Sequence, residues 1–507
     1  MSVDLLATAV VVILGIAVLV AIPLTMMASA IPYASFSAPS NRHEFISRKV
    51  VVLGLVAVFA GGCLMGIGAW LARGDSRYGA LSALVMTSMA LFGTGLLTVG
   101  LSPLPSWLLE VLGPFAERWP ASVRLAVRDL AQRRARAAVA ITLVMVTTAF
   151  GLALMIIVVG QTAQSRAEYQ PSGRLGSLLV QPRSTFGLPF SVADAVAVRA
   201  AMERELPGVP IAQSESVPDP SSFWADAESV EMPEEAFSWR EVIGDEKVLR
   251  YLTGDQSTPY DENTAVVITS ADVRVDSVNL SYKRDDKDGT MVSKAVRAVA
   301  ARTSDPHMEG VFVPSKIVRD LGFQLQPMDL IVDPTLHRTT AEEQRRLDDR
   351  LDDAVARVYV ERGFEASTWW RSVATLAFLA AVGCAPAAGF GRVANSRQAR
   401  VMRRIGKGTN AAFRLFCAFR AGVSALCGTV LGAFLGCAAG ISLLWPLTVR
   451  GGWEDPARVS FETPWTLVVA VVAGVPVLAA VLGAVFARER PHIPAPPAGR
   501  SWVHEVG

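Results

Sequence analysis

The stretch "VRLAVRDLAQRRARAAVAITLVMV", from Val123 to Val146, changes character halfway along its length. Five arginines lie between Val123 and Arg136, and no charged residue follows between Ala137 and Gly160. A run of about 20 apolar residues is long enough to cross the hydrocarbon core of a bilayer as a helix. Arginine clusters beside such a run are typical of the cytoplasmic side of a membrane. The stretch therefore predicts a transmembrane helix over 138–160 that begins inside the cell.

The rest of the chain also indicates a membrane protein. Hydrophobic residues make up 51% of its 507 residues and the mean hydropathy is +0.36, which is too apolar for a wholly soluble protein. The first apolar run lacks the basic start of a secretory signal and is too long for one, so we expect a retained helix there. Seven windows are long enough to span a bilayer: about 5–31, 50–72, 79–101, 138–160, 370–390, 415–446 and 464–487.

Charge is divided unevenly along the chain. Residues 161–370 hold 35 acidic and 23 basic side chains, a net charge of −12, whereas the remainder has a net charge of +14. The basic segments 118–136 and 392–414 belong on the cytoplasmic side, which places the acidic block outside. Counting through the helices then puts the N-terminus outside and the C-terminus in the cytoplasm. No basic face is concentrated in the soluble part, which argues against nucleic acid as a partner.

We therefore expect an α-helical integral membrane protein of the cell membrane, with about seven transmembrane helices and one α+β extracytoplasmic domain. The expected parts are three transmembrane helices over 1–101, a cytoplasmic amphipathic basic segment over 102–137, a helix over 138–160, the extracytoplasmic domain over 161–369, a helix over 370–390, a cytoplasmic basic segment over 391–414, two helices over 415–487 and a cytoplasmic tail over 488–507.

Residues 121–136 have the periodicity of an amphipathic helix, with Val123, Val127 and Leu130 on one face and Asp129 off that face. Such a helix lies in the membrane interface with its arginines towards anionic lipid head groups. Two interpretations stay open: the charge only sets the topology, or the helix is a pivot that passes motion into the next transmembrane helix. The arginines concerned are Arg124, Arg128, Arg133, Arg134 and Arg136.

The acidic block is predicted to be mixed α and β. "AVVITS" and "LIVD" are short β-rich runs, and helices are expected after the Ser cap of "SVADAVAVRAAMERELPGV" and through "TTAEEQRRLDDRLDDAVARVYVERGF". The stretch 213–263, rich in Pro, Ser and acids, predicts a loop-dominated insertion. His307 and His337 are isolated and indicate surface residues. "DDRLDD" lacks the Gly-centred loop of a calcium site, so we expect a solvated helix face.

The five cysteines all fall in the apolar windows, so the acidic block must fold without disulfides. Cys-x-x-Cys spacing is absent from the sequence, and we expect neither a metal nor a cofactor. In the sixth window Gly428, Gly432, Gly436 and Gly440 repeat every four residues. A stripe of this kind permits close helix packing in lipid. Its partner is either a helix of the same chain or a second subunit.

The second basic segment contains "RVANSRQARVMRRIGKGTNAAFRLF", from Arg392 to Phe416. Its "GKGT" lacks the upstream glycine and the preceding strand of a phosphate-binding loop, so it does not predict nucleotide binding. The order of parts nevertheless resembles a known family. "LAVRDLAQRRARAAVAITLVMV" leads into a helix, an extracytoplasmic domain and a second helix follow, and a basic helix ending in "MRRIG" precedes two more helices. This order, together with "VFVPSKIVRDLGFQLQPMDLIV" and "VYVERGF", is similar to the FtsX-like, MacB-type permeases of ABC transporters over about 120–490.

The resemblance implies a permease without enzymatic activity, which works in pairs and is driven by a separate cytoplasmic ATPase. It also implies that closure of the ATPase moves the extracytoplasmic domain, for export or extraction of a peptide, drug or lipid-type substrate. The first three helices look like the remnant of a first repeat plus a joining pair, so the chain is a shortened two-repeat form. By position, the segment that couples to the ATPase is Gln398, Arg400, Val401, Met402, Arg403, Arg404, Ile405 and Gly406. Family members often have Glu near Gln398, so this chain departs from the family at a position where a charge would contact the ATPase.

Two other function classes stay open. The chain could be a membrane sensor or scaffold that regulates an extracytoplasmic partner such as a cell-wall hydrolase, in which case its activity survives loss of an ATPase. A membrane-embedded hydrolase is disfavoured because the sequence has no nucleophile and base in a recognisable pattern. The apolar windows also lack acids and lysines, which usually mark a path for ions or polar solutes. For the second basic segment, with Arg403 and Arg404, two interpretations stay open: the resemblance implies a contact with the ATPase, or the charge only sets the topology.

Overall fold

The computed structural model describes residues 43–72, 80–105, 107–108, 121–132, 134–184, 188–219, 222–227, 240–283, 291–303, 305–352, 354–390, 410–448 and 458–486. The chain divides into two compact units. The sheet unit is Tyr169–Glu365, and the membrane unit combines Met1–Glu168 with Ala366–Gly507. The first predicted window, 5–31, lies outside the described residues.

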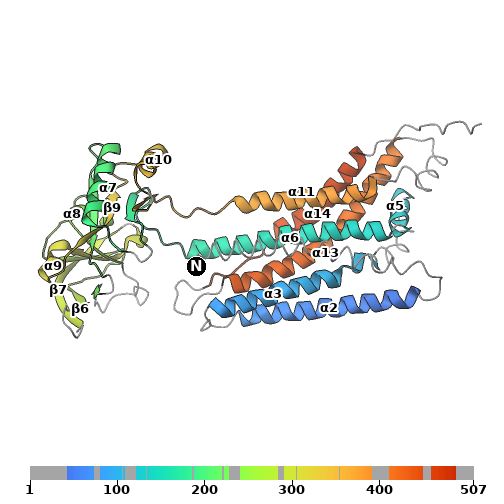
Figure 1. Cartoon of the computed structure of the whole chain (residues 1–507), viewed down its shortest axis with the longest axis horizontal. Helices are drawn as coiled ribbons and strands as arrows, with labels where there is room; N and C mark the ends of the chain where they lie inside the picture. The colour runs from blue at the N-terminus through green and yellow to red at the C-terminus, as the bar shows by residue number, and fades with distance from the viewer. Residues whose placement is uncertain are drawn as a thin grey trace, which may run out of the picture. The chain divides into compact units, whose positions relative to one another are not determined.

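The membrane unit is a bundle of long helices, drawn side by side in Figure 1. Its helices are α2 (His43–Leu71), α3 (Ala80–Leu101), α5 (Ala121–Gln132), α6 (Arg134–Ala167), α11 (Trp369–Phe390), α13 (Asn410–Leu447) and α14 (Trp465–Val485). Five stretches of the described chain are long and apolar enough to cross a membrane: Val52–Leu71, Ser82–Leu101, Ala137–Ala167, Arg414–Leu447 and Trp465–Val485. Helix α11 has a shorter apolar stretch, Trp369–Cys384. The structure thus supports a membrane protein, and the count of seven spans stays a prediction.

Helix α6 is the central element of this bundle. Within its candidate span, 83% of the most apolar stretch is buried inside the structure, against 50% for α13 and less than 40% for the other three spans. The helix continues seven residues beyond the expected boundary at 160 and ends at Ala167, directly before the sheet unit. Because α6 touches other helices over most of its surface, its sequence is apolar all round rather than amphipathic.

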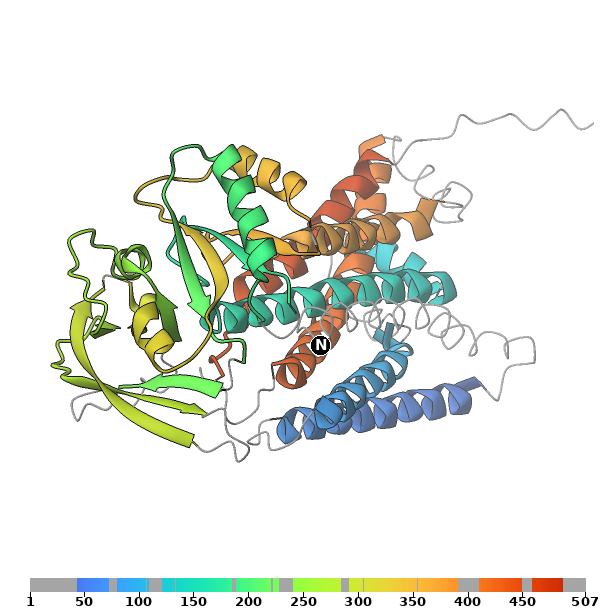
Figure 2. The ribbon, with the colours of Figure 1, turned by 60° about the vertical axis from the view of Figure 1, so that its left-hand side comes forward.

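The glycine stripe of α13 packs against α6 of the same chain. Each of its four glycines lies so close that an added Cβ would come within 2.6–2.9 Å of an α6 atom, a separation that real Cβ atoms do not adopt. The backbones of the two helices are therefore in direct contact over more than three turns. Figures 1 and 2 both show α6 and α13 crossing at the middle of the bundle. The contacting pairs are Gly428 with Val144, Gly432 with Met145, Gly436 with Ala149 and Gly440 with Ile156.

Two further glycine pairs, which the sequence reading did not single out, join α2 to α3. A Cβ on Gly54 would lie 2.8 Å from the Gly100 carbonyl oxygen, and one on Gly61 would lie 2.7 Å from the Gly93 carbonyl oxygen. The reverse additions are equally close. The two glycines of each helix are seven residues apart, two turns along one face. The helices α2 and α3 therefore form a closely packed pair.

The stripe gives the first testable prediction. In Gly432→Ala the methyl group must displace the α6 backbone at Met145, so the helices separate and lose contacts along the seam. We expect a loss of about 1–3 kcal/mol of stability, the usual range for an overpacked core. Thermal unfolding of the full chain in detergent measures it. Gly474→Ala is the matched control because a Cβ there meets no atom within 4 Å. Equal melting temperatures for both variants would contradict the packing described.

The sheet unit is built on a ten-stranded mixed sheet with the strand order β10-β1-β9-β2-β4-β8-β5-β7-β6-β3. Neighbours are antiparallel except β4 with β8 and β5 with β7, which are parallel. The strands are β1 (Leu178–Pro182), β2 (Ile211–Ser216), β3 (Phe223–Asp226), β4 (Arg240–Gly244), β5 (Ala265–Thr269), β6 (Ser277–Lys283), β7 (Met291–Arg302), β8 (Gly310–Pro314), β9 (Gln326–Val332) and β10 (Ala356–Val360).

Helices cover both faces of this sheet. Helices α7 (Val192–Glu205) and α10 (Ala341–Arg350) lie together over β10, β1, β9 and β2, where Met202 and Leu347 are fully buried (Figure 2). Helix α8 (Glu246–Thr253) packs on the opposite face, and the short α9 (Ser315–Asp320) follows β8. The helix starts follow local chemistry: Ser191, Asp245 and Thr340 accept hydrogen bonds from the first free backbone N–H groups.

Two sequence interpretations of this unit were wrong. The stretch 213–263 is not loop-dominated: its described part holds β3, β4, α8 and the end of β2. The expected helix through "AVARVYV" ends at Arg350, and Ala356–Val360 is the edge strand β10. In that strand Ala356, Val358 and Val360 alternate with polar or half-exposed residues and face the core, which is the period of a strand. The same letters fit a helical stripe, so composition alone could not separate the two.

Candidate functional site

The predicted coupling residues lie outside the part of the chain that the structure describes. They are Gln398, Arg400, Val401, Met402, Arg403, Arg404, Ile405 and Gly406, and Arg133 of the predicted pivot is also outside. The described helices on either side bracket this segment: α11 ends at Phe390 and α13 begins at Asn410. The first described element that follows this segment in the chain is α13.

Helix α5 contains the start of the predicted pivot and lies at the beginning of α6 (Figure 1). The side chains of Arg124 and Arg128 are exposed, and Arg134 and Arg136 belong to the first turn of α6. The opposite face of α5 is fully buried, with Ala126, Val127 and Leu130 at most 1% exposed. This apolar face is covered by protein: Leu130 belongs to a cluster with Ala137 and Ile141 of α6 and with Val423 and Cys427 of α13.

Asp129 lies on this buried side of α5, contrary to its expected place off the apolar face. Only 2% of the residue is exposed. Its Oδ2 accepts a hydrogen bond from Nη1 of Arg420 on α13, and the two side chains form an ion pair. Arg420 is itself 8% exposed, so both charges are removed from water. Burial of a carboxylate is tolerated where an opposite charge satisfies it, which is the physical reason for the difference.

A second polar contact joins helix ends at the other end of α13. The Arg458 guanidinium donates to the carbonyl oxygens of Ala72, Trp445 and Thr448 at 3.2, 3.0 and 3.3 Å, and stacks over the Trp445 ring at 4.9 Å. These carbonyls lie in or directly after the last turns of α2 and α13, where backbone acceptors lack helical partners. The neighbouring Val459 N–H donates to Oε1 of the buried Gln164 on α6 at 3.0 Å. One short segment thus fastens three helix ends.

The two polar contacts lie about one membrane thickness apart. Arg420 and Trp445 are 25 residues apart on α13, or about 38 Å at the rise of an α-helix, compared with a hydrocarbon core of about 30 Å. Exposed tryptophans occur in the last turn of α2 and at the first residues of α11 and α14: Trp70, Trp369 and Trp465. Tryptophan at helix ends is typical of a membrane interface. These tryptophans lie at the same helix ends as the Arg458 contact and indicate one bilayer edge there, and the Asp129–Arg420 contact lies about one membrane thickness from it.

The neck of the sheet unit, where the chain enters and leaves it, is held by one buried carboxylate. Glu361 is 1% exposed and accepts hydrogen bonds from the Tyr169 hydroxyl, the Ser172 N–H at 2.9 Å and the Gly363 N–H at 3.0 Å. Burial, and then the hydrogen bond to Glu361, raise the pKa of Tyr169 above its usual value, so the phenol stays protonated and donates. Entry and exit segments are therefore tied together.

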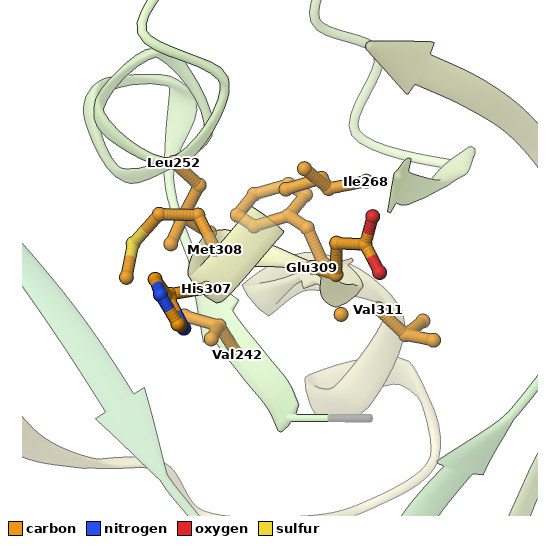
Figure 3. Close-up of a pocket in the computed structure, with 9 residues that line it drawn as sticks. Val242, Leu252, Ile268, His307, Met308, Glu309 and Val311 are labelled. Carbon is orange, nitrogen blue, oxygen red and sulfur yellow. The ribbon is translucent and has the colours of Figure 1, made fainter. Parts of the chain in front are cut away.

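No group of three or more His, Cys, Asp or Glu side chains that could hold a metal ion occurs among the described residues. Figure 3 shows a shallow pocket lined by His307, Met308, Glu309 and apolar neighbours. It has room for about one water molecule, too little for a substrate. His307 is exposed as expected, whereas His337 is half-buried with Nε2 3.4 Å from the Glu343 carboxylate.

Comparison with known proteins gives no assignment of its own. The chain matches no model of a known protein family. A search of curated proteins found no similar sequence.

The sequence analysis did not predict the Asp129–Arg420 ion pair, the contacts of Arg458 with the helix ends or those of Glu361 at the neck of the sheet unit. A signal for the ion pair was present: Asp129 is the one acid of an otherwise cationic segment, and Arg420 interrupts an apolar window. Arg420 has no acidic residue nearby in sequence that would explain its place, whereas the arginines around Asp129 concealed its distant partner. Arg458 and Glu361 carry no such signal, because a charge in a loop or at the end of a strand is common. Their roles depend on contacts made across the fold.

A half-buried carboxylate inside the sheet unit also affects its stability. Glu241 on β4 accepts a hydrogen bond from the Ala225 N–H of β3 at 2.9 Å, although β3 is the last strand of the sheet and β4 is not its neighbour. The sheet therefore curls so that β3 returns towards β4. Burial raises the pKa of Glu241 from 4.5 to about 7 and outweighs the opposing effect of the Ala225 hydrogen bond.

This shift predicts a pH dependence with a definite sign. A carboxyl group whose pKa is higher in the folded state binds more protons when folded, so stability falls as pH rises between about 4.5 and 7 and is level above that range. Glu241→Gln stays neutral and removes this part of the fall. Thermal unfolding of the full chain at pH 5 and pH 8 measures it, with the exposed Glu262→Gln as control. A wild-type slope in Glu241→Gln would contradict the assignment.

Proposed function

We propose that the chain is the membrane-spanning permease subunit of an ABC transporter of the FtsX/MacB type. In this proposal the chain has no hydrolytic activity and transmits motion from a separate cytoplasmic ATPase to the sheet unit outside the membrane. The sheet unit then drives export or extraction of a peptide, drug or lipid-type substrate. The permease works as one of a pair, with a second copy or a related chain.

The observation that carries the proposal is the continuous backbone contact between α13 and α6. Helix α13 begins at Asn410, inside the predicted basic segment 391–414, and α6 ends directly before the sheet unit. Their glycine seam therefore links the predicted ATPase contact to the domain through two unbroken helices. Because interiors in close contact deform little, displacement of one helix moves the other. A chain built only to anchor a domain has no need of this arrangement.

A second contact supports the same route. Helix α11, which leads from the sheet unit back to the basic segment, also packs on α6: a Cβ on Gly151 would lie 2.9 Å from the Phe378 ring. The two helices that connect the sheet unit to the membrane unit are therefore packed on each other, and the neck residues Tyr169 and Glu361 join the chain just beyond them. The sheet unit can thus respond as one body to movement of the helix pair.

The described membrane unit also fits a protein that transmits force better than one that conducts a solute. Among the described residues of the candidate spans, the buried charged side chain is Arg420, which pairs with Asp129 of α5, and the other buried polar side chains are Thr, Ser and Gln. Channels and carriers usually mark their paths with ionisable groups. The proposed orientation, with the basic segments in the cytoplasm, follows the distribution of arginine.

Association with an ATPase tests the proposal. The chain, purified in mild detergent from its native membrane, should carry an ATPase subunit in a fixed ratio. Arg403→Glu with Arg404→Glu should lower the recovered ATPase by at least about tenfold, because reversed charges facing an acidic partner cost several kcal/mol. Arg297→Glu with Arg302→Glu, two exposed arginines of the sheet unit, is the control and should retain the subunit.

Unchanged ATPase recovery with Glu at 403 and 404 would refute the coupling assignment. Absence of any ATPase from the unaltered chain, with activity that persists without one, would favour a membrane sensor or scaffold that regulates an extracytoplasmic partner.

A further inference from the structure

The ion pair between Asp129 and Arg420 joins α5 to α13, close to the start of α6. Arg420 is ten residues from the first residue of α13, about 15 Å along the helix axis from the end of the basic segment. Asp129 is on α5, which is separated from the first residue of α6 only by Arg133. The pair, whose members are 291 residues apart in sequence, thus connects the early part of α13 to the helix that directly precedes α6.

We infer that Asp129 and Arg420 are positioning residues that make α5 and the first third of α13 move as one body, so that displacement of the basic segment reaches the cytoplasmic end of α6. This inference rests on the proposed function, which supplies the source of the motion. It adds a defined element to the route: α5 is a coupling helix in its own right, attached to α13 by charge and to α6 by the chain.

Burial makes it costly to separate the two charges, so α5 stays attached to α13. At 2% and 8% exposure, the two charges gain little from water and much from each other, and separating them would leave each charge in an apolar cluster. The guanidinium is planar and holds a carboxylate in a defined geometry, unlike an ammonium group. The contact is therefore expected to stay closed while α13 moves, in contrast to an exposed pair such as Arg302 with Asp272.

Apolar packing around the pair supports the same unit. Leu130, one residue after Asp129, is 1% exposed and packs with Val423, three residues after Arg420. The same cluster includes Ala137 and Ile141 of α6. Helix α5 therefore packs against both the first turns of α6 and the early part of α13. If α5 follows α13, it pushes or releases α6 at its cytoplasmic end, whereas the glycine seam acts along the middle of α6.

Hydrogen exchange of the complete transporter tests the inference. The chain with its co-purified ATPase, reconstituted in nanodiscs, is compared without nucleotide and with ATP plus vanadate. In the unaltered chain, nucleotide should change the exchange rates of both α13 and α5. In Asp129→Asn the change in α13 should persist, and the change in α5 should shrink by about tenfold, the size of a typical coupling between sites. ATPase association and hydrolysis should stay within about twofold of the unaltered complex, as coupling need not alter the driving step.

Three variants separate coupling from mere support of the fold. Asp129→Glu keeps the charge and should retain most of the α5 response, while Arg420→Lys keeps the charge but loses the planar fork and should retain part of it. Asp272→Asn, which removes the acid of an exposed pair, should respond like the unaltered chain. If Asp129→Asn does not fold, Arg420→Lys still gives the comparison.

A full α5 response in both Asp129→Asn and Arg420→Lys would overturn the inference and leave the proposed function standing. Absence of an ATPase, or of any nucleotide response in the unaltered chain, would overturn both.

Discussion

Direct backbone contact between α6 and α13 is the constraint on which the membrane unit depends. In lipid there is no water to expel, so helices associate through close contact and polar groups rather than through the hydrophobic effect that folds soluble domains. Four glycines spaced about one turn apart remove the α13 side chains from these positions and let the α13 backbone approach α6. The remaining helices are arranged around this pair: α11 against α6, α14 against α13, and the closely joined α2 and α3 beside them. A side chain added at one of the four glycines would separate α13 from α6 and disturb the packing of the helices around them.

Polar contacts act at the two ends of the same helix. Arg420 meets Asp129 near the start of α13, and Arg458 caps the carbonyl groups at its end. A strong charge pair in the middle of the bilayer would be costly, whereas at the edges it fixes helix ends at a known depth. The apolar seam therefore sets how closely α6 and α13 pack, and the polar ends set how far they slide. The proposed transmission of motion needs both: a stiff contact between the helices and a defined reference at each end.

The membrane helices, the glycine stripe and the separate acidic block could be predicted from local sequence patterns. Apolar windows, arginine clusters and the four-residue glycine period each follow from a short stretch of sequence, and the acidic block was recognisable from its charge. The partner of the glycine stripe was left between two alternatives, because the sequence shows a smooth face and not what covers it. Within one chain, α6 lies against these four positions. Asp129 was assigned to the polar side of its helix because periodicity treats every carboxylate as exposed, whereas its guanidinium partner lies 291 residues away. Strand β10 was read as helix because Ala and Val suit both periods, and pairing with β1 decides between them.

In the proposed arrangement the basic segments and the acidic sheet unit lie on opposite sides of the membrane, and α6 and α11 connect the sheet unit to the membrane unit. The most direct measurement labels single engineered cysteines in intact cells with a membrane-impermeant maleimide, in a chain whose five native cysteines are replaced by alanine. A cysteine at Asp272, whose side chain is 92% exposed in the sheet unit, should be labelled, and one at Thr409 in the basic segment should react only after the membrane is opened. Labelling of Thr409→Cys but not Asp272→Cys in intact cells would invert the orientation and contradict the transporter account.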